Sequence, residues 1–363
     1  MNQIKGDAMT QLVNSLPDRT GKEAGVFAVY ALSQEERNIC LKSDVAIAKA
    51  KNWQVALATI ENGKVKYYLY DGEDDSQPSV GDGVITMTTA KAVGETVMLK
   101  MIYTGDAPTL SGLTGTPESG KTIIYTLTSQ TVTITGDVTY FDCGNNQLTA
   151  LDVSKNTALT ELYCNDSQLT ALDVSQNTAL TRLSCYNNQL TELDVSQNTA
   201  LTGLSCYDNL LTALDVSKNT ALIWLNCERN QLTALDVSQN TALTGLDCSD
   251  NLLTALDVSQ NIALSGLYCS NNQLTALDVS QNTALENLYC YNNQLTALDV
   301  SQNTALTDLV CERNQLTALD VSKNTALIWL DCPNNQLTAL DVSQNTALEI
   351  LSCYGNQIKG EEM

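Results

Sequence analysis

The chain contains no histidine among its 363 residues. Histidine is the commonest general base near neutral pH and a frequent ligand of transition metals. We also find no nucleophile elbow, phosphate-binding loop or dinucleotide fingerprint. The sequence therefore predicts a protein that is not an enzyme and that holds no catalytic residue, metal or other cofactor.

Basic residues and long apolar runs are also scarce. The chain has 19 Lys and Arg against 41 Asp and Glu, a net charge of −22. Nucleic-acid binding depends on basic side chains that neutralise phosphates, so this balance argues against a nucleic-acid partner. No run of 18 apolar residues occurs, which argues against direct membrane insertion. The first residues do not have the pattern of a signal peptide.

Eleven of the twelve cysteines follow one another at intervals of 21 residues. Around each runs the pattern L-x-x-L-x-C-x-x-N-x-L-x-x-L-D-V-S-x-N-x-x, as at residues 180–200. A fixed period of this length is typical of solenoids, in which each repeat stacks on the next. We therefore predict a solenoid of about ten 21-residue repeats over residues 138–358.

Each repeat contains two similar arcs, one ending in L-x-C and the other in L-D-V. Both triplets alternate as a strand does, so we expect β-structure in both arcs and parallel pairing between coils. The leucines should fill a continuous core. Two asparagine series, one in each arc, should satisfy backbone groups of neighbouring coils.

The cysteines predict a structural ladder without metal or disulfides. Metal sites use short C-x-x-C spacings, which are missing here. Stacked cysteines on neighbouring in-register strands also direct their Cβ atoms poorly for a disulfide. We expect small, buried, reduced side chains at Cys164, Cys185, Cys206, Cys227, Cys248, Cys269, Cys290, Cys311 and Cys332.

The repeat resembles the nested 21-residue class of bacterial leucine-rich repeats. It is similar to the cysteine-ladder repeats of internalin J and of surface proteins from gut anaerobes. The resemblance implies that the parent protein is displayed on the cell surface or secreted, and that it acts in adhesion or host interaction by binding protein. It implies no particular ligand, and we find no sortase-type anchor in the sequence.

The regions outside the repeats predict smaller units. Residues 1–70 predict an α/β unit that resembles a leucine-rich repeat cap, with helices over 7–16 and from 43, and strands over 25–32, 54–60 and 65–70. Residues 71–137 predict an acidic linker and a β-rich cap with strands over 84–88, 97–103, 122–128 and 131–135. Residues 356–363 repeat the pattern of residues 2–9, so 359–363 should begin a following segment.

Variation between repeats concentrates around L-x-C, whereas the L-D-V arc is nearly constant. Alternation should send the variable side chains outward and gather them on one sheet face, which we call the variable face. The candidate ligand-binding residues are Trp224, Trp329, Tyr163, Arg182, Tyr186, Tyr207, Glu228, Tyr268, Tyr289, Tyr291 and Glu312.

Exposed Trp and Tyr on a rigid surface favour a protein ligand, for which a host surface protein is one candidate. The same aromatic side chains beside Asp and Asn also suit stacking on a glycan. The third interpretation is neutral variation on a structural spacer that has no ligand.

The L-D-V-S motif places one aspartate in each coil, from Asp152 to Asp341. These carboxylates could bind Ca²⁺ between coils or accept hydrogen bonds from nearby Ser and Thr. Ca²⁺ needs six to eight converging oxygens, and one aspartate per coil supplies few. We therefore expect hydrogen-bonded, solvated carboxylates.

Overall fold

The computed structural model describes residues 12–18, 20, 25–30, 42–51, 53–61, 64–69 and 83–358. The chain divides into two compact units, Met1–Gly81 and Asp82–Met363. Residues 71–82 of the predicted linker and cap region over 71–137 lie outside the described residues, as do the first part of the helix over 7–16 and the segment 359–363.

The first unit has the predicted α/β character. Its elements are β1 (Gly25–Tyr30), α2 (Lys42–Ala50), β2 (Trp53–Glu61) and β3 (Lys64–Leu69), and residues 12–14 are helical. β1 pairs with β2 in parallel, and β2 forms an antiparallel hairpin with β3. A small core of Val13, Val45, Ala48 and Val55 holds this unit together.

The second unit begins with a β-rich cap. Its strands are β4 (Val84–Thr89), β5 (Thr96–Tyr103), β6 (Thr109–Ser111), β7 (Leu113–Thr114), β8 (Thr122–Leu127) and β9 (Thr131–Thr135). The four strands predicted here are present, and β6 and β7 are additional short strands. Leucines, valines and cysteines of the repeats form one continuous core with the buried residues of the cap.

The first coil joins the cap through both of its arcs. β10 (Val138–Asp142) pairs in parallel with β12 (Glu161–Tyr163) and antiparallel with β5, while β11 (Leu148–Asp152) pairs antiparallel with β4. The Asn146 amide oxygen accepts a hydrogen bond from Met98 N (2.9 Å), and the Asn146 amide nitrogen donates to Met98 O (2.7 Å). Strand β5 thus takes the place that a preceding coil would occupy.

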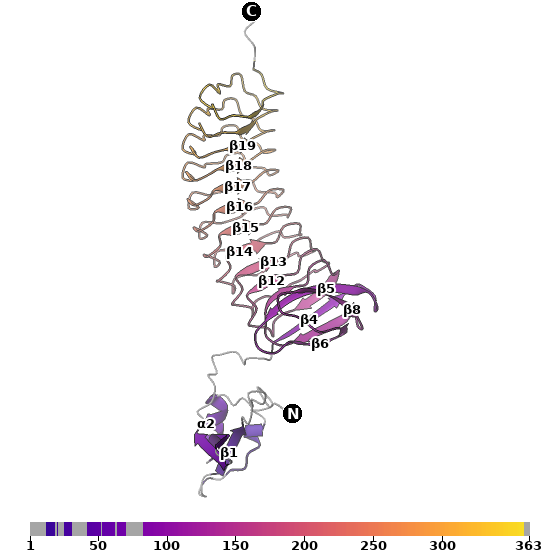
Figure 1. The fold of residues 1–363 in the computed structure, drawn as a ribbon. Coiled ribbons are helices and arrows are strands. Elements are labelled where there is room, and N and C mark those ends of the chain that lie inside the picture. Colours follow the sequence, from indigo (N-terminus) through magenta and orange to yellow (C-terminus); the bar gives the residue numbers. More distant parts are fainter. Residues whose placement is uncertain are drawn as a thin grey trace, which may run out of the picture. The chain divides into compact units, whose positions relative to one another are not determined.

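The solenoid stacks its coils in register, as Figure 1 shows. One short strand from each coil forms a parallel ladder: β12 (Glu161–Tyr163), β13 (Arg182–Ser184), β14 (Gly203–Ser205), β15 (Trp224–Asn226), β16 (Gly245–Asp247), β17 (Gly266–Tyr268), β18 (Asn287–Tyr289), β19 (Asp308–Val310), β20 (Trp329–Asp331) and β21 (Ile350–Ser352). Together with β10 and the cap strands β5, β8 and β7, they make a 14-stranded sheet.

The prediction of strands in the second arc was wrong for every coil except the first, where β11 pairs with the cap. The arc closes instead through consecutive turns. In the coil after β12, Asn177 N donates to Val174 O (2.9 Å) and Leu180 N donates to Asn177 O (3.0 Å). These turns bring the chain back to the sheet.

Two asparagine ladders connect the coils, as the repeat predicts. In the variable arc, the Asn230 amide nitrogen donates to Cys206 O, Cys227 O and Glu228 O (3.1–3.2 Å), and its oxygen accepts from Leu211 N (3.0 Å). In the other arc, Asn240 donates to two carbonyls, Val216 O and Asn219 O, and its buried amide oxygen has no hydrogen-bond partner within the described residues. The first ladder therefore makes more hydrogen bonds per residue.

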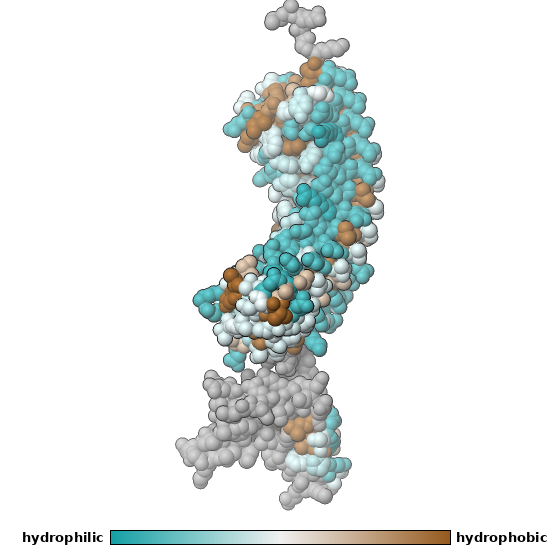
Figure 2. All heavy atoms as spheres, turned by 90° about the vertical axis from the view of Figure 1, so that its right-hand side faces the viewer, coloured by the Kyte–Doolittle hydropathy of each residue, from teal (hydrophilic) through white to brown (hydrophobic). Residues whose placement is uncertain are grey.

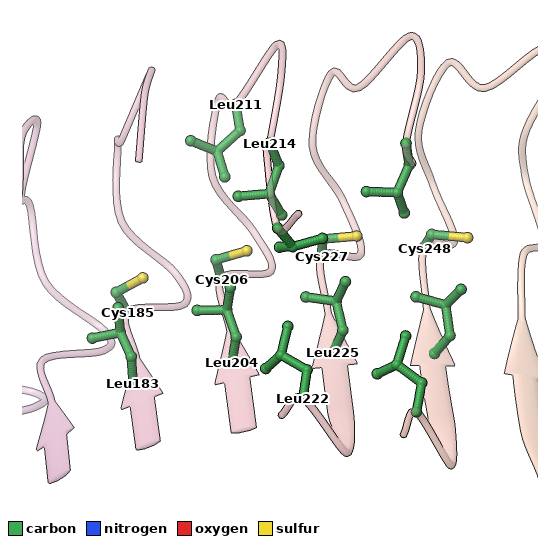
Figure 3. Packing of buried hydrophobic residues seen from close by; sticks show 14 of the residues in the cluster. Leu183, Cys185, Leu204, Cys206, Leu211, Leu214, Leu222, Leu225, Cys227 and Cys248 are labelled. Carbon is green, nitrogen blue, oxygen red and sulfur yellow. The ribbon is translucent and has the colours of Figure 1, made fainter. Parts of the chain in front are cut away.

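The cysteines form the expected ladder of free thiols. Figure 3 shows Cys185, Cys206, Cys227 and Cys248 in one row beside the strands, with leucines packed next to them. The ten thiols from Cys143 to Cys332 are fully buried, whereas Cys353 in the last coil is half buried. Burial raises the pKa of the Cys206 thiol to about 12.

These properties predict the thiol chemistry. A buried, protonated thiol is not a nucleophile, so native ladder cysteines should resist a disulfide reagent. In a Cys40→Ser variant, we expect Ellman's reagent to titrate only Cys353 in the native protein and all eleven ladder thiols in denaturant without reductant. A lower count in denaturant would reveal disulfides, and rapid native reaction of several thiols would contradict the buried ladder.

The aspartates of the L-D-V-S motif make the expected hydrogen bonds. In each coil, the backbone N–H of the serine two residues later donates to an aspartate oxygen, as between Ser259 and Asp257 (2.9 Å). Hydrogen bonds from the Ser259 backbone and then from its hydroxyl lower the pKa of Asp257. Each carboxylate therefore closes a turn of its own coil.

Candidate functional site

Two outward positions per strand build the variable face. They flank the buried central leucine, so that Trp224 and Asn226 lie on either side of Leu225 in β15. In-register parallel pairing stacks these positions into two columns, and the residues after the cysteines form a third. Figure 2 shows a largely hydrophilic surface with separate apolar spots on the side of the solenoid that it presents.

The first group on the variable face surrounds a pocket of about 410 Å³ near the cap. Tyr163, Arg182 and Trp224 line it together with Gly203, which lies between the strands of Arg182 and Trp224. A methyl group at Gly203 would have only Arg182 Cγ nearby, at 3.9 Å. The missing side chain at Gly203 therefore helps to leave this space open.

The Tyr163 hydroxyl donates a hydrogen bond to Glu161 Oε2 (2.8 Å) at the edge of this pocket. Burial, and next the hydrogen bond to Glu161, raise the pKa of Tyr163 to about 12, while a hydrogen bond with Arg182 acts in the opposite direction. The phenol is therefore neutral at physiological pH and lies beside a guanidinium group.

Trp224 has 42% of its surface exposed and lies against the next coil. A methyl group at Gly245 would collide with the six-membered ring of Trp224. In a variant whose other tryptophans are phenylalanine, we expect Gly245→Ala to displace this indole and to increase its quenching by acrylamide. Gly203→Ala is the matched control and should leave the quenching unchanged. Equal quenching of the wild type and Gly245→Ala would contradict the contact.

The second group consists of Tyr268, Tyr289 and Trp329. Tyr268 and Tyr289 are register partners in β17 and β18, and their ring centroids lie 5.1 Å apart at 70°. The Trp329 ring reaches Tyr289 across the intervening strand β19, with centroids 6.0 Å apart at 79°. All three side chains are half buried, so they present a fixed but accessible aromatic surface.

The third group lies in the column after the cysteines. Tyr186 and Tyr207 stack in parallel, with centroids 4.3 Å apart and planes inclined by 7°. Tyr291 lies farther along this column, where its hydroxyl is 3.5 Å from the Asn271 amide nitrogen. The structure therefore divides the candidate aromatic residues among separate groups along the face.

Glu228 and Glu312 occupy the same column but bind arginines of their own coils. Arg229 Nε lies 3.4 Å from Glu228 Oε1, and Arg313 Nε lies 3.3 Å from Glu312 Oε1. Both arginines have a positive φ, near 50°, where the other coils have Asn or Asp and the last coil has Gly355. Asn and Asp tolerate this conformation better, which explains their frequency after C-x.

The sequence-based candidates did not include the glycines of the strands, such as Gly203, or the residues directly before each strand, such as Thr202 and Ile223. Gly203, Thr202 and Ile223 line the pocket, although none of them was a candidate residue. Ile223 and Ile328 replace the usual Thr directly before the two solenoid tryptophans and are 47% and 41% exposed. This repeated Ile-Trp pair was the available signal for a wider apolar surface.

The constant arc carries a second hollow of about 670 Å³, lined by Asp173, Asp194, Asp215, Glu192 and neighbouring serines and leucines. Its residue types hardly change from coil to coil, except that Glu192 stands where the other coils have Ala, as at Ala171 and Ala213. Within the ranges that the structure describes, no group of three or more acidic or cysteine side chains could hold a metal ion, and no helix is long and apolar enough to cross a membrane.

Comparison with known proteins agrees with this architecture. The functional domain of InlJ from Listeria monocytogenes, which includes a cysteine ladder, is 42% identical, with 63% of this chain and 57% of that chain covered and a TM-score of 0.61. The internalin InlF from Listeria monocytogenes is 25% identical, with 61% and 72% covered and a TM-score of 0.56. This chain thus spans little more than half the length of the InlJ domain.

A more distant structure shows the fold alone. The leucine-rich repeat ectodomain of the receptor kinase GASSHO1/SCHENGEN3 from Arabidopsis thaliana, in complex with CASPARIAN STRIP INTEGRITY FACTOR 2, is 22% identical, with 56% and 28% covered and a TM-score of 0.52.

A family model for the LVIVD repeat matches residues 128–167, where the cap meets the first coils. A search of curated proteins finds no match. The 21-residue coils, the buried ladder of free cysteines and the likeness to InlJ lead to one conclusion: residues 138–358 form a leucine-rich repeat solenoid with a cysteine ladder, similar to that of InlJ.

Proposed function

We propose that the variable face is a protein-recognition surface. The observation that carries this proposal is the gathering of aromatic side chains on one rigid sheet face, while the opposite arc stays uniform. Tyrosine and tryptophan offer a large contact area at a low cost in side-chain entropy, and they are enriched among the residues that dominate binding energies.

The surrounding architecture supports this proposal. Hydrogen-bonded parallel strands and two asparagine ladders fix the backbone beneath the aromatic groups, so little ordering is needed when a partner binds. The pocket at Tyr163, Arg182 and Trp224 can receive a protruding side chain.

We further propose that the module works outside the cell, displayed on the surface or secreted with its parent protein, as an adhesion or host-interaction module. The likeness to internalins supports this location. No catalytic role is needed to explain any feature of the variable face, so we propose a binding module rather than an enzyme.

A glycan ligand is the second candidate, favoured by Tyr and Trp beside Asp247, Asp308 and Asp331. Parallel screens on an array of extracellular proteins and an array of glycans separate the two. We expect reproducible signals on the protein array that a Trp224→Ala/Trp329→Ala variant loses. Binding signals confined to the glycan array would favour sugar binding. No binding signal on either array would indicate a structural spacer.

Single substitutions test the two tryptophans separately. We expect Trp224→Ala and Trp329→Ala each to weaken binding to the array-identified ligand by about 1–4 kcal/mol, as at other interface anchors. Thermal stability should change little, because both side chains lie outside the leucine core. Gln239→Ala on the constant arc is the control and should change neither quantity. Intact binding by both tryptophan variants would place the ligand elsewhere.

A further inference from the structure

The rings of Tyr289 and Trp329 contact each other across β19, the strand that carries the carboxylate of Asp308, and Tyr268 contacts Tyr289 on the next strand. Asp308 lies in β19, and its register neighbours are Asn287 in β18 and Trp329 in β20. Trp329 reaches back across this strand to Tyr289. The coil of Asp308 therefore lies between the coil of Tyr289 and the coil of Trp329, whose rings contact each other. The carboxylate and the aromatic rings therefore belong to one surface.

Burial is the first cause that raises the pKa of Tyr268 and of Tyr289, and the negative charge of Asp308 also raises the pKa of both tyrosines. The Asp308 side chain accepts a hydrogen bond from the Thr307 hydroxyl (2.7 Å). No lysine or arginine in the described part of the chain forms an ion pair with it.

The charge around this group is negative. The variable arcs of these coils carry Glu286, Asp308, Glu312 and Asp331, and their one basic residue, Arg313, lies 3.3 Å from Glu312 Oε1. A cation is attracted to the face of an aromatic ring and to a nearby carboxylate, so the two attractions add at such a site. An anionic ligand would be repelled by both.

We propose that the partner presents a basic segment and that one of its lysine or arginine side chains binds on Tyr268, Tyr289 and Trp329 beside Asp308. This inference rests on the proposed protein-recognition function and specifies the partner's chemistry. The net charge of −22 adds a long-range attraction that speeds the encounter with a basic partner.

The test uses a random dodecapeptide display library selected on the whole chain, because the partner is unidentified. We expect enriched peptides to share a lysine or arginine. For a fluorescent copy of one such peptide, Asp308→Asn should raise the dissociation constant by about 10-fold, the effect expected when a cation on aromatic rings loses its carboxylate. Replacing the peptide's basic residue by glutamine should abolish the difference between the wild type and Asp308→Asn.

Asp299→Asn is the matched control, because it removes the same charge on the constant arc and asparagine can still close that turn. It should change the dissociation constant by less than about 2-fold, as expected for a distant, screened surface charge. This comparison separates the aromatic site from a general attraction between a basic peptide and an acidic protein.

Two results would overturn the inference. One is enrichment of peptides without basic residues, and the other is an equal effect of Asp308→Asn and Asp299→Asn. If Trp224→Ala or Trp329→Ala still weakened peptide binding in either case, protein recognition by the variable face would stand while the basic partner would not. A selection without binders, or binders indifferent to every substitution on the face, would count against both proposals.

Discussion

Replacing Asn230 by alanine should lower the free energy of unfolding by about 3–5 kcal/mol, since several buried backbone groups lose their partners together. Its amide donates to the carbonyls of Cys206, Cys227 and Glu228 and accepts from Leu211 N. Alanine can replace none of these bonds. Because Asn230 is buried, with only 8% of its surface exposed, water cannot easily satisfy all of these groups in its place.

Urea unfolding followed by circular dichroism measures this loss. Asn240→Ala is the informative comparison, because Asn240 donates only to Val216 O and Asn219 O and its oxygen is already without a partner. We expect it to cost less than Asn230→Ala. Gln231→Ala, at an exposed neighbouring position, should cost almost nothing. If Asn230→Ala and Gln231→Ala lowered the free energy of unfolding equally, the asparagine ladder would not be a main source of stability.

Replacing Cys227 by tyrosine should be similarly damaging, with a loss of about 3–5 kcal/mol from overpacking and from a buried hydroxyl without a partner. Cys227 is completely buried and stacks between Cys206 and Cys248, as Figure 3 shows. A ring has no room there unless the adjacent coils separate. In a solenoid this separation should also uncouple the coils on either side of the substitution.

Cys227→Ala is the control for the chemistry of the thiol. It leaves only a small cavity and should cost much less than tyrosine. A second unfolding transition in urea for Cys227→Tyr would show that the array has been divided. Wild-type stability of Cys227→Tyr would mean that the ladder position has spare volume, which would contradict the close packing of the coils.

The repeat was predictable because one physical constraint recurs in every coil. A leucine, cysteine or asparagine at a fixed position meets its copy 21 residues away, so an observation on one coil holds for all. Strand β15, which directly precedes Cys227, and the hydrogen bonds of Asn230 follow from this constraint. The cap strands were also predictable, because each is a short alternating run between turn residues.

Features that depend on pairing between different segments were not predictable in the same way. The L-D-V triplet has strand-like alternation, yet only the first coil forms a strand there, where β4 of the cap pairs with it; in the later coils the arc closes through turns. The antiparallel pairing of β5 with β10 and of β4 with β11 depends on how the cap folds onto the first coil. Sequence alone contained no signal for that arrangement.

The variable face was predictable as a surface, but its grouping was not. Alternation places Trp224, Tyr289 and Trp329 outward, yet their contacts depend on rotamers and on neighbouring glycines. Gly203 helps to leave a pocket beside Trp224, while Trp329 reaches across one strand to Tyr289. Spacing along the chain does not reveal either arrangement.

The most direct test of the variable face as a recognition surface is the affinity of a Trp224→Ala/Trp329→Ala variant for the ligand found on the protein array, measured by calorimetry beside Gln239→Ala. We predict that the double variant binds at least about 30-fold more weakly, as expected when two interface anchors are lost. Its melting temperature should match that of the wild type, and Gln239→Ala should bind normally. Wild-type affinity in the double variant would contradict the assignment of binding to this face.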